Sequence, residues 1–231
     1  MSPKIYIMLT LSENLNKSWE FFVKLFDDIG KTILLIVLEI IPIINFIVLG
    51  YGYEIIRLGD SIEEPPALEN LGDLFIKGFK VFIVIFLYFI IPVAVFFVII
   101  GPFIIGNIFY LYASGGISLL FYSGIFWTAY FAAFIVGLGV AVIALMGIIH
   151  AIKTDNLGKA FAFSEILELI RRVGWDLYLP WVLVMYIAMY VIASIQQWII
   201  QAILSALFVV FFSRSAHYIY PTEEAIEEAV E

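Results

Sequence analysis

The chain has 231 residues, of which 64% are hydrophobic and only 14% are charged. Ordinary soluble domains have about 45–50% apolar and about 25% charged residues, so this composition excludes a water-soluble globular protein. The formal net charge is −8, but the last ten residues supply five of the acids. The charge therefore describes a tail, and it gives no indication of a nucleic-acid partner.

The longest uncharged stretch sets the fold class. Residues 81–152 are 72 residues without Asp, Glu, Lys or Arg. A helix crosses the roughly 30 Å hydrocarbon layer in about 20 residues, so this stretch holds two or three crossings. We predict an all-α protein, a polytopic transmembrane helical bundle of four to five spans with the lipid bilayer as a partner. Residues 1–220 are expected to form one helical membrane domain, and residues 221–231 an acidic tail.

Near the N-terminus, residues 13–30 are predicted to form an amphipathic helix. Apolar residues recur at helical spacing, and charged residues lie on the opposite face. The apolar set is Leu15, Trp19, Phe22, Phe26 and Ile29, and the charged set is Glu13, Lys17, Glu20, Lys24, Asp27 and Asp28. We expect this helix to lie in the membrane interface, although packing against polar connectors gives the same pattern.

Residues 32–56 form the first apolar segment, and two arrangements fit it. The segment contains Glu39, Pro42 and Asn45. It either crosses the membrane once as a kinked helix or forms a re-entrant helical hairpin that turns at Pro42. Each half of a hairpin, about 11–14 residues, is too short to cross, so neighbouring helices must cover its backbone groups.

Lysine and arginine residues orient the other segments, because positive residues near span ends stay in the cytoplasm. They are concentrated in two connectors, residues 57–80 and 153–176, which we place on the cytoplasmic side of a multi-pass protein of the cell membrane. An even number of spans must separate the connectors, and residues 81–152 hold two comfortably. Residues 101–124 are left over, and their Gly, Pro, Asn and Tyr content predicts an interfacial or re-entrant segment at the outer face.

The last third of the chain has a second amphipathic helix, predicted over residues 159–175. Its apolar face consists of Phe163, Ile166, Leu167, Ile170 and Val173. Residues 177–213 are then expected to form two short spans that turn near Gln196. This turn returns the C-terminus to the cytoplasm.

Polar residues inside apolar segments are the candidate binding residues, because such groups are costly in lipid and often functional. Glu39 is the foremost candidate, as a protonatable or cation-binding group with Asn45 and the carbonyls freed by Pro42 nearby. The structural alternatives are an interhelical hydrogen bond or contact with water in a shallow hairpin. His150 is a third candidate, and an ordinary position at the cytoplasmic end of its span explains it as well.

Small residues form the clearest packing pattern in the sequence. Ala129, Ala133, Gly137 and Ala141 repeat at every fourth position, and such a ridge lets a second helix approach closely. The second helix belongs either to the same chain or to another copy in a homodimer.

The sequence contains no P-loop, no Gly-x-Gly-x-x-Gly after a strand, no nucleophile elbow and no His-Glu-x-x-His. It has two histidines, far apart, and no cysteine, so disulfides and thiolate sites are excluded. We therefore expect no enzyme activity, no cofactor and no metal site.

Three blocks resemble a known family. They are IPIINFIVLGY at residues 41–51, GDLFIKGFK at residues 72–80 and KAFAFSEI at residues 159–166. Together they are similar to a predominantly archaeal family of polytopic membrane proteins of unknown function. The resemblance implies a helical membrane architecture over most of the chain, and it implies no particular activity.

These features lead us to expect a non-enzymatic membrane protein that organises the membrane or binds partners, either as a homo-oligomer or with another membrane protein. The alternative is a small-solute or ion transporter or channel that uses Glu39 inside the membrane. A lipid-modifying enzyme is a third hypothesis, for which the sequence shows no recognisable site.

Overall fold

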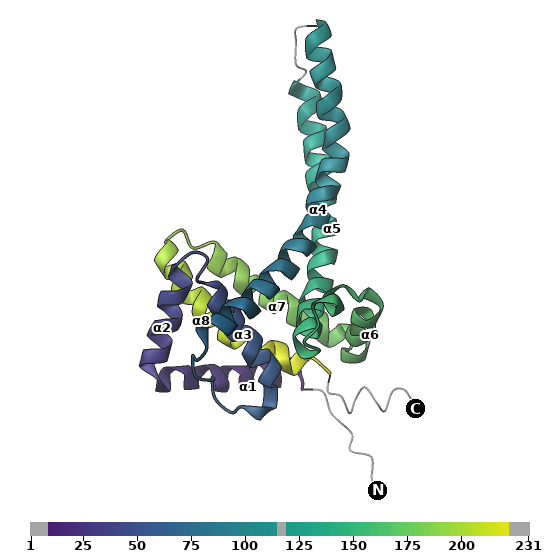
Figure 1. Ribbon diagram of the computed structural model, residues 1–231. Coiled ribbons are helices and arrows are strands. Elements are labelled where there is room, and N and C mark those ends of the chain that lie inside the picture. Colours follow the sequence, from purple (N-terminus) through teal and green to yellow (C-terminus); the bar gives the residue numbers. More distant parts are fainter. Residues whose placement is uncertain (1–8, 115–118, 222–231) are drawn as a thin grey trace. The chain divides into compact units, whose positions relative to one another are not determined.

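The computed structural model describes residues 9–114 and 119–221, and these residues form helices and no strand (Figure 1). In chain order the α-helices are α1 (Leu11–Val23), α2 (Ile29–Ile40), α3 (Phe46–Leu58), α4 (Leu71–Ser114), α5 (Leu119–Lys153), α6 (Phe163–Val173), α7 (Trp175–Ala193) and α8 (Trp198–Ile219). Three short 3-10 helices are η1 (Lys24–Asp27), η2 (Gly59–Ser61) and η3 (Leu157–Phe161). The prediction of an all-α protein is confirmed.

Within the described residues, four helices are long and apolar enough to cross a membrane. These stretches are Leu71–Pro102, Gly124–Lys153, Trp175–Ala193 and Trp198–Ile219, and they make the chain an integral membrane protein. The last two are separated by a turn around Gln196, as predicted. Except for Pro221, the acidic tail lies outside the described residues.

The helices group into two compact units, which are described separately. Unit 1 comprises Met1–Val84 and Leu145–Glu231, and unit 2 comprises Ile85–Ala144. In unit 1, α8 is the central helix and packs against α1, α2, α3 and α7. The core around it includes the fully buried side chains of Leu25, Leu35, Val48, Tyr51, Ile55 and Val210.

Residues 32–56 form a hairpin of two helices, α2 and α3, which pack against each other and against α8 (Figure 1). Helix α2 ends at Ile40 because the next residue precedes Pro42 and takes an extended conformation, with φ −91° and ψ 112° at Ile41. The turn also places Ile43 at φ 73°. The arrangement as one kinked helix is therefore wrong.

Helices α3 and α4 cross with their backbones in contact. A Cβ atom added at Gly50 would overlap the carbonyl of Leu74, and one added at Gly78 would overlap the carbonyl of Phe46. Only glycine allows this approach at both positions. The crossing explains two glycines in the blocks that resemble the known family.

The first amphipathic helix is shorter than the predicted range of residues 13–30. It starts earlier because Thr10 and Glu13 form a capping box, in which the Glu13 N–H donates to Thr10 Oγ1 at 3.3 Å and the Thr10 N–H donates to Glu13 Oε2 at 2.8 Å. It cannot continue to residue 30 because Asp28 caps the next helix and accepts a hydrogen bond of 2.9 Å from the Lys31 N–H.

The buried face of α1 also differs from the predicted one. Of the predicted apolar face, Trp19, Phe26 and Ile29 are 58%, 46% and 69% exposed. Phe22 is buried as expected, but Asn14 and Ser18 are buried beside it. Hydrogen bonds inside the protein satisfy Asn14 and Ser18 on the buried face. The large rings of Trp19 and Phe26 are therefore left exposed on the surface.

The second amphipathic helix, predicted over residues 159–175, is limited to α6. Residues 157–161 form η3, and Gly174, with φ 88°, ends α6. The buried side chains of α6 are Ile166, Leu169, Ile170 and Val173, whereas Phe163 and Leu167 are exposed.

Unit 2 contains parts of α4 and α5, packed side by side. The rings of Phe96 and Phe126 lie 5.8 Å apart between their centroids. The interfacial segment expected at residues 101–124 is wrong for the described part, because α4 continues to Ser114 and α5 begins at Leu119. Pro102 lies inside α4, and such prolines are tolerated in membrane helices when neighbouring groups satisfy the freed carbonyl.

Candidate functional site

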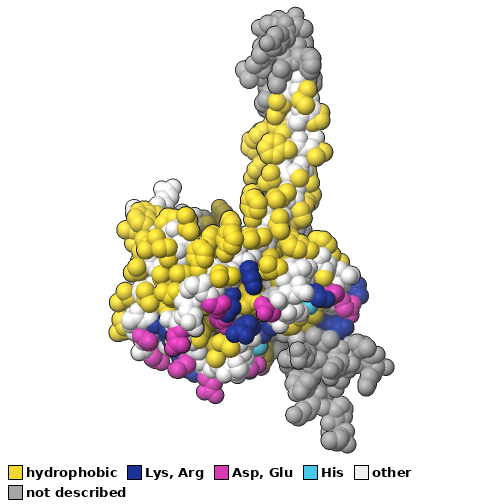
Figure 2. All heavy atoms as spheres, viewed as in Figure 1, with side chains coloured by type: hydrophobic (Ala, Val, Ile, Leu, Met, Phe, Trp, Pro, Cys, Tyr) yellow, Lys and Arg dark blue, Asp and Glu magenta, His cyan; other side chains and the backbone are white. Residues whose placement is uncertain are grey.

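The charged side chains of unit 1 gather on one side, below the apolar ends of α2, α7 and α8 in the view of Figure 2. Both predicted connectors meet there. At the end of α8, His217 Nε2 lies 3.3 Å from Asp60 Oδ1, and its Nδ1 accepts a hydrogen bond of 2.6 Å from Lys153 Nζ. We call the side formed by α1, the two connectors and the end of α8 the charged face.

Glu39 lies near the end of α2, away from that face. It is half-buried, and no hydrogen bond or ion pair is found between Glu39 and another described residue. Burial raises the pKa of Glu39 to about 7. The carboxyl can therefore change its protonation state near neutral pH.

Asn45 does not join Glu39 in a site. It occupies the N-cap position of α3, but its side chain makes no capping hydrogen bond. Its carbonyl accepts hydrogen bonds of 3.0 Å from the Val48 N–H and 3.3 Å from the Leu49 N–H. The contacts of Asn45 are thus those of a helix start.

His150 is buried and connects three elements of the charged face. Its Nδ1 lies 2.8 Å from the hydroxyl of Tyr220, and its Nε2 lies 3.0 Å from Glu165 Oε2. Lys159 Nζ donates to the other carboxylate oxygen of Glu165 at 2.6 Å. Both ring nitrogens are occupied, so these contacts hold α5, α6 and the residue after α8 together.

The small-residue ridge lies on α5. Ala129 is fully buried, and Ala133, Gly137 and Ala141 are partly exposed. In unit 2, a Cβ added at Gly137 would lie 3.6 Å from Pro92 Cβ. The ridge therefore has a neighbour within the same chain.

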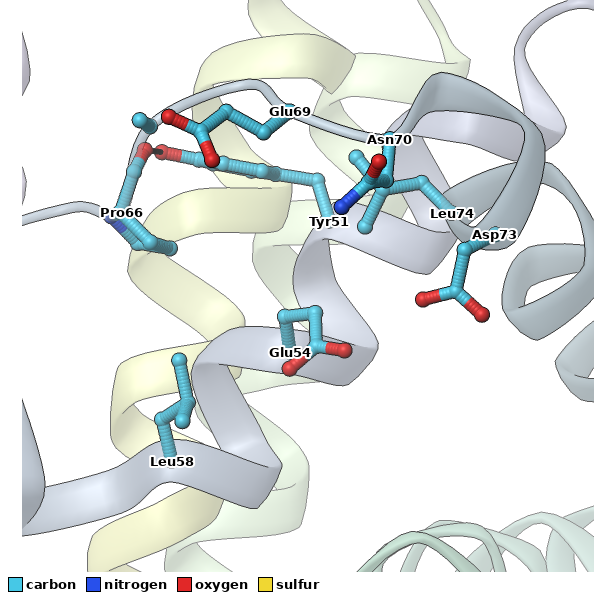
Figure 3. Close-up of a pocket in the computed structure, with 9 residues that line it drawn as sticks. Tyr51, Glu54, Leu58, Pro66, Glu69, Asn70, Asp73 and Leu74 are labelled. Carbon is cyan, nitrogen blue, oxygen red and sulfur yellow. Dashed lines mark hydrogen bonds between the residues drawn. The ribbon is translucent and has the colours of Figure 1, made fainter.

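The charged face contains a hollow of about 180 Å³ between α3, the following loop and the start of α4 (Figure 3). Tyr51, Glu54, Leu58, Pro66, Ala67, Glu69, Asn70, Asp73 and Leu74 line it. We call it the acidic hollow. The hydroxyl of Tyr51 donates a hydrogen bond of 2.7 Å to the carbonyl of Pro66 and holds the loop over α3.

Cations already neutralise much of the acidic hollow. Lys77 forms ion pairs with both Glu54 and Asp73, and Arg57 Nη2 donates to Glu54 Oε2 at 2.7 Å. The hydrogen bond that Arg57 donates to Glu54 raises the pKa of Arg57. In the part of the chain that the structure describes, no group of three or more His, Asp or Glu side chains is arranged to hold a metal ion.

A second hollow, of about 280 Å³, lies between α1 and the end of α8. Lys17, Glu20, Phe21, Lys24, Glu63, Arg214 and Tyr218 line it, and we call it the arginine hollow. The Arg214 side chain is buried, and its Nη1 donates to the carbonyl of Gly59 at 2.5 Å. Its Nε is the one buried side-chain polar atom without a hydrogen-bond partner among the described residues.

Sequence reasoning missed the polar contacts that place α1 beside this hollow. Asn14 Nδ2 donates to the carbonyl of Ser215 at 3.2 Å, and Ser215 Oγ donates to Asn14 Oδ1 at 2.7 Å. Trp181 Nε1 donates to Ser215 Oγ at 2.8 Å. The buried network joins α1, α7 and α8, but nothing in the sequence links residues that are 201 positions apart.

Exposed carboxylates on the charged face are held ionised by their donors. The hydrogen bond from the Tyr53 hydroxyl lowers the pKa of Asp155. Hydrogen bonds from Lys159 and His150 lower the pKa of Glu165. Asp155 and Glu165 therefore keep their charge at neutral pH.

No curated protein and no solved structure matches this chain. The model of one family, described as "Protein of unknown function (DUF4013)", matches residues 33–209, from α2 to α8. Because this match covers more than half of the 231 residues, the chain belongs to that family.

Proposed function

We propose that this protein is a non-enzymatic, membrane-embedded binding protein that recognises its partners through the charged face of unit 1. The distribution of charge carries the proposal. Residues 81–152 and 177–212, which make up most of the four spans, contain no Asp, Glu, Lys or Arg. Both hollows described above lie at the charged face. The chain thus has recognition groups at one membrane face and no charged path across the bilayer.

The lysines and arginines of the two connectors support a cytoplasmic location for this face in the cell membrane. The exposed rings of Trp19 in α1 and Phe26 in η1 support insertion of this segment into the interface. In this arrangement the short α2–α3 hairpin enters the bilayer beside α8 and returns to the same face. The protein then anchors a charged surface without exposing a large soluble domain.

A different membrane protein is a better candidate partner than a second copy of this chain that would pack against the small-residue ridge of α5. The ridge has Pro92 of the same chain as a neighbour, so α5 does not need a partner to cover Gly137. A charged face favours a partner of complementary charge, because such pairing guides association and excludes wrong partners.

Site-specific photo-crosslinking in native membranes tests the proposal. A photoreactive amino acid at Glu69, in the acidic hollow, is expected to give discrete protein adducts. The matched control is Ile187, which is exposed on the apolar span α7 and is expected to give lipid adducts only. Equal protein adducts at both positions, or none at Glu69, contradict recognition through the charged face.

Glu39 favours a second candidate function, transport of protons, cations or a small solute. It is half-buried with no hydrogen-bond or ion-pair partner among the described residues, and its pKa is raised to about 7. Flux of protons and monovalent cations through the purified protein in liposomes is the direct measurement, with Glu39→Gln as the variant. We expect no flux above that of empty liposomes. A flux that Glu39→Gln eliminates would overturn the binding-protein proposal.

A further inference from the structure

We propose that the arginine hollow binds a phosphate group, carried either by a small soluble phosphate monoester or by a lipid headgroup. The inference deepens the proposed function, because it names a ligand class for the charged face and rests on that assignment. All lining residues except Glu63 lie outside residues 33–209, the range of the family match.

Arg214 is the central group of the hollow. It is 5% exposed, and its guanidinium carbon lies 4.5 Å from the ring centroid of Phe21 and 4.7 Å from that of Tyr218. Both rings lie within cation–π distance of the guanidinium and contribute to its burial. A buried guanidinium in this setting interacts strongly with an anion, because the local dielectric constant is low.

One guanidinium nitrogen of Arg214 lacks a partner among the described residues. Nη1 donates to the Gly59 carbonyl, and Nη2 lies 3.6 Å from Asp60 Oδ1. Nε has no partner in the described structure. An unpaired buried donor is costly, so native proteins usually satisfy such groups with a ligand, an ion or water. Under this proposal, a phosphate oxygen in the hollow is the missing partner of this guanidinium, through a charge-assisted bond.

Two lysines supply further positive charge at the mouth of the hollow. Lys17 Nζ lies 5.9 Å from the ring centroid of Tyr218, and Lys24 Nζ donates to the backbone carbonyl of Glu63 at 3.0 Å. Within the described residues, neither ammonium group forms an ion pair with a carboxylate. Both charges therefore remain available to an anionic ligand.

The balance of charge in the hollow favours an anion. Three cationic side chains face two carboxylates, those of Glu20 and Glu63, so the lining has a net charge of +1. Both glutamates are exposed to solvent, where water screens their charge, whereas the Arg214 cation is buried. The deepest part of the hollow is thus its most positive part.

The size of the hollow limits the ligand. Its volume is about 280 Å³, just below the range of about 300–1,000 Å³ that is typical of small-molecule sites. A phosphate with a short polar substituent fits this space better than a nucleotide does. Such a group occurs both in soluble phosphate esters and in phospholipid headgroups. The proposed insertion of the exposed Trp19 and Phe26 rings would bring the hollow close to the membrane interface.

Binding measurements on the full chain distinguish the two sources. Isothermal titration calorimetry in detergent at low ionic strength uses inorganic phosphate and glycerol 3-phosphate as soluble probes. Native mass spectrometry of protein released from phosphatidylcholine nanodiscs, with or without phosphatidic acid, detects a retained lipid. We expect saturable binding of glycerol 3-phosphate, or selective retention of phosphatidic acid, at one site.

Variants connect the binding to the hollow. The double variant Lys17→Gln/Lys24→Gln is expected to weaken binding at least tenfold, because it removes two charged donors at the surface. Lys80→Gln/Arg171→Gln removes the same charge elsewhere on the charged face and is expected to bind like the parent. Arg214→Lys keeps the charge but removes the planar donor. When its circular dichroism spectrum and melting temperature match those of the parent, this variant should weaken binding to a similar extent.

Each result decides the proposal. Binding of a soluble probe that only the hollow variants weaken supports a soluble ester, and selective retention of phosphatidic acid with the same variant pattern supports a lipid headgroup. Absence of both kinds of binding, or equal binding by the parent and the double lysine variant, overturns it. If Arg214→Lys does not fold, the double lysine variant decides alone. A negative result here leaves the crosslinking at Glu69 and the flux assay unaffected, so the two proposals fail separately.

Discussion

The Nζ of Lys31 donates a hydrogen bond of 2.7 Å to the carbonyl of Pro65, across 34 positions of the chain. Lys31 lies in the first turn of α2, and Pro65 follows α3 and η2. The contact shows that the chain returns, after α3, to the level at which α2 began. A single crossing would separate these two residues by the thickness of the bilayer, about 30 Å.

This contact predicts the topology of the N-terminal half. Cysteines introduced at Glu20 and Ser61 should react with a membrane-impermeant maleimide from the same side of sealed vesicles, since both residues are exposed at the charged face. A cysteine at Gln197, in the turn between α7 and α8, should react from the opposite side. The chain has no cysteine of its own, so the background is low. Labelling of positions 20 and 61 from opposite sides would show that the hairpin crosses.

The glycine crossing predicts a large effect of one methyl group. Gly78→Ala places a Cβ against the carbonyl of Phe46, and the two helices must move apart because neither backbone can rotate away. We expect a loss of about 3 kcal/mol in the free energy of unfolding, the upper end of the cost of overpacking. Thermal unfolding followed by circular dichroism in detergent measures it.

Gly72→Ala is the matched control for this crossing. Gly72 also lies in α4, but a Cβ there has nothing within 4 Å. Alanine should therefore leave the melting temperature unchanged or raise it, by the helix preference of about 0.5–1 kcal/mol. Equal destabilisation by both changes would show that α3 and α4 do not touch at Gly78.

Hydropathy predicted the spans correctly because a membrane helix is specified by a local property, its length of apolar sequence. The turn at Pro42 was also accessible, since proline restricts the residue before it. Local sequence signals also mark the ends of α1, namely the Thr10–Glu13 capping box and the Asp28 cap. Because the apolar spacing continues beyond Asp28, the helix was predicted to extend too far.

The candidate site is formed by contacts between residues that are far apart in the sequence, so the sequence alone did not predict it. Arg214 follows a long apolar segment, and its partners Phe21 and Gly59 lie in other elements. Asn14 and Ser18 belong to neither set of residues that defined the predicted amphipathic helix, and they are buried and satisfied by each other and Ser215. Only folding brings such residues together, so a periodic pattern does not identify them.

The left-handed conformation at Ile43 predicts a stabilising substitution. Its φ of 73° is unfavourable for a β-branched residue, and the side chain is 67% exposed, so little packing offsets the strain. Ile43→Gly should raise the free energy of unfolding in detergent by about 1 kcal/mol. Ile44→Gly is the control, because Ile44 lacks a positive φ and glycine there should destabilise. A loss of stability on Ile43→Gly would contradict the turn geometry.

Glu39 predicts a pH dependence of stability with a definite sign. Its pKa is raised from 4.5 to about 7 in the folded protein by burial. The folded state therefore holds this proton more tightly than the unfolded state, and the stabilisation is present below pH 4.5 and is lost as the pH rises to about 7. Glu39→Gln stays neutral at every pH, so it should melt higher than the parent at pH 8 and should differ little from it at pH 4. Glu64→Gln, an exposed carboxylate in the loop before α4, is the control and should follow the parent at both values. If the melting temperatures of the parent and Glu39→Gln differ by the same amount at pH 4 and at pH 8, the Glu39 carboxyl is hydrated in the folded protein. This result would also remove the main observation in favour of transport.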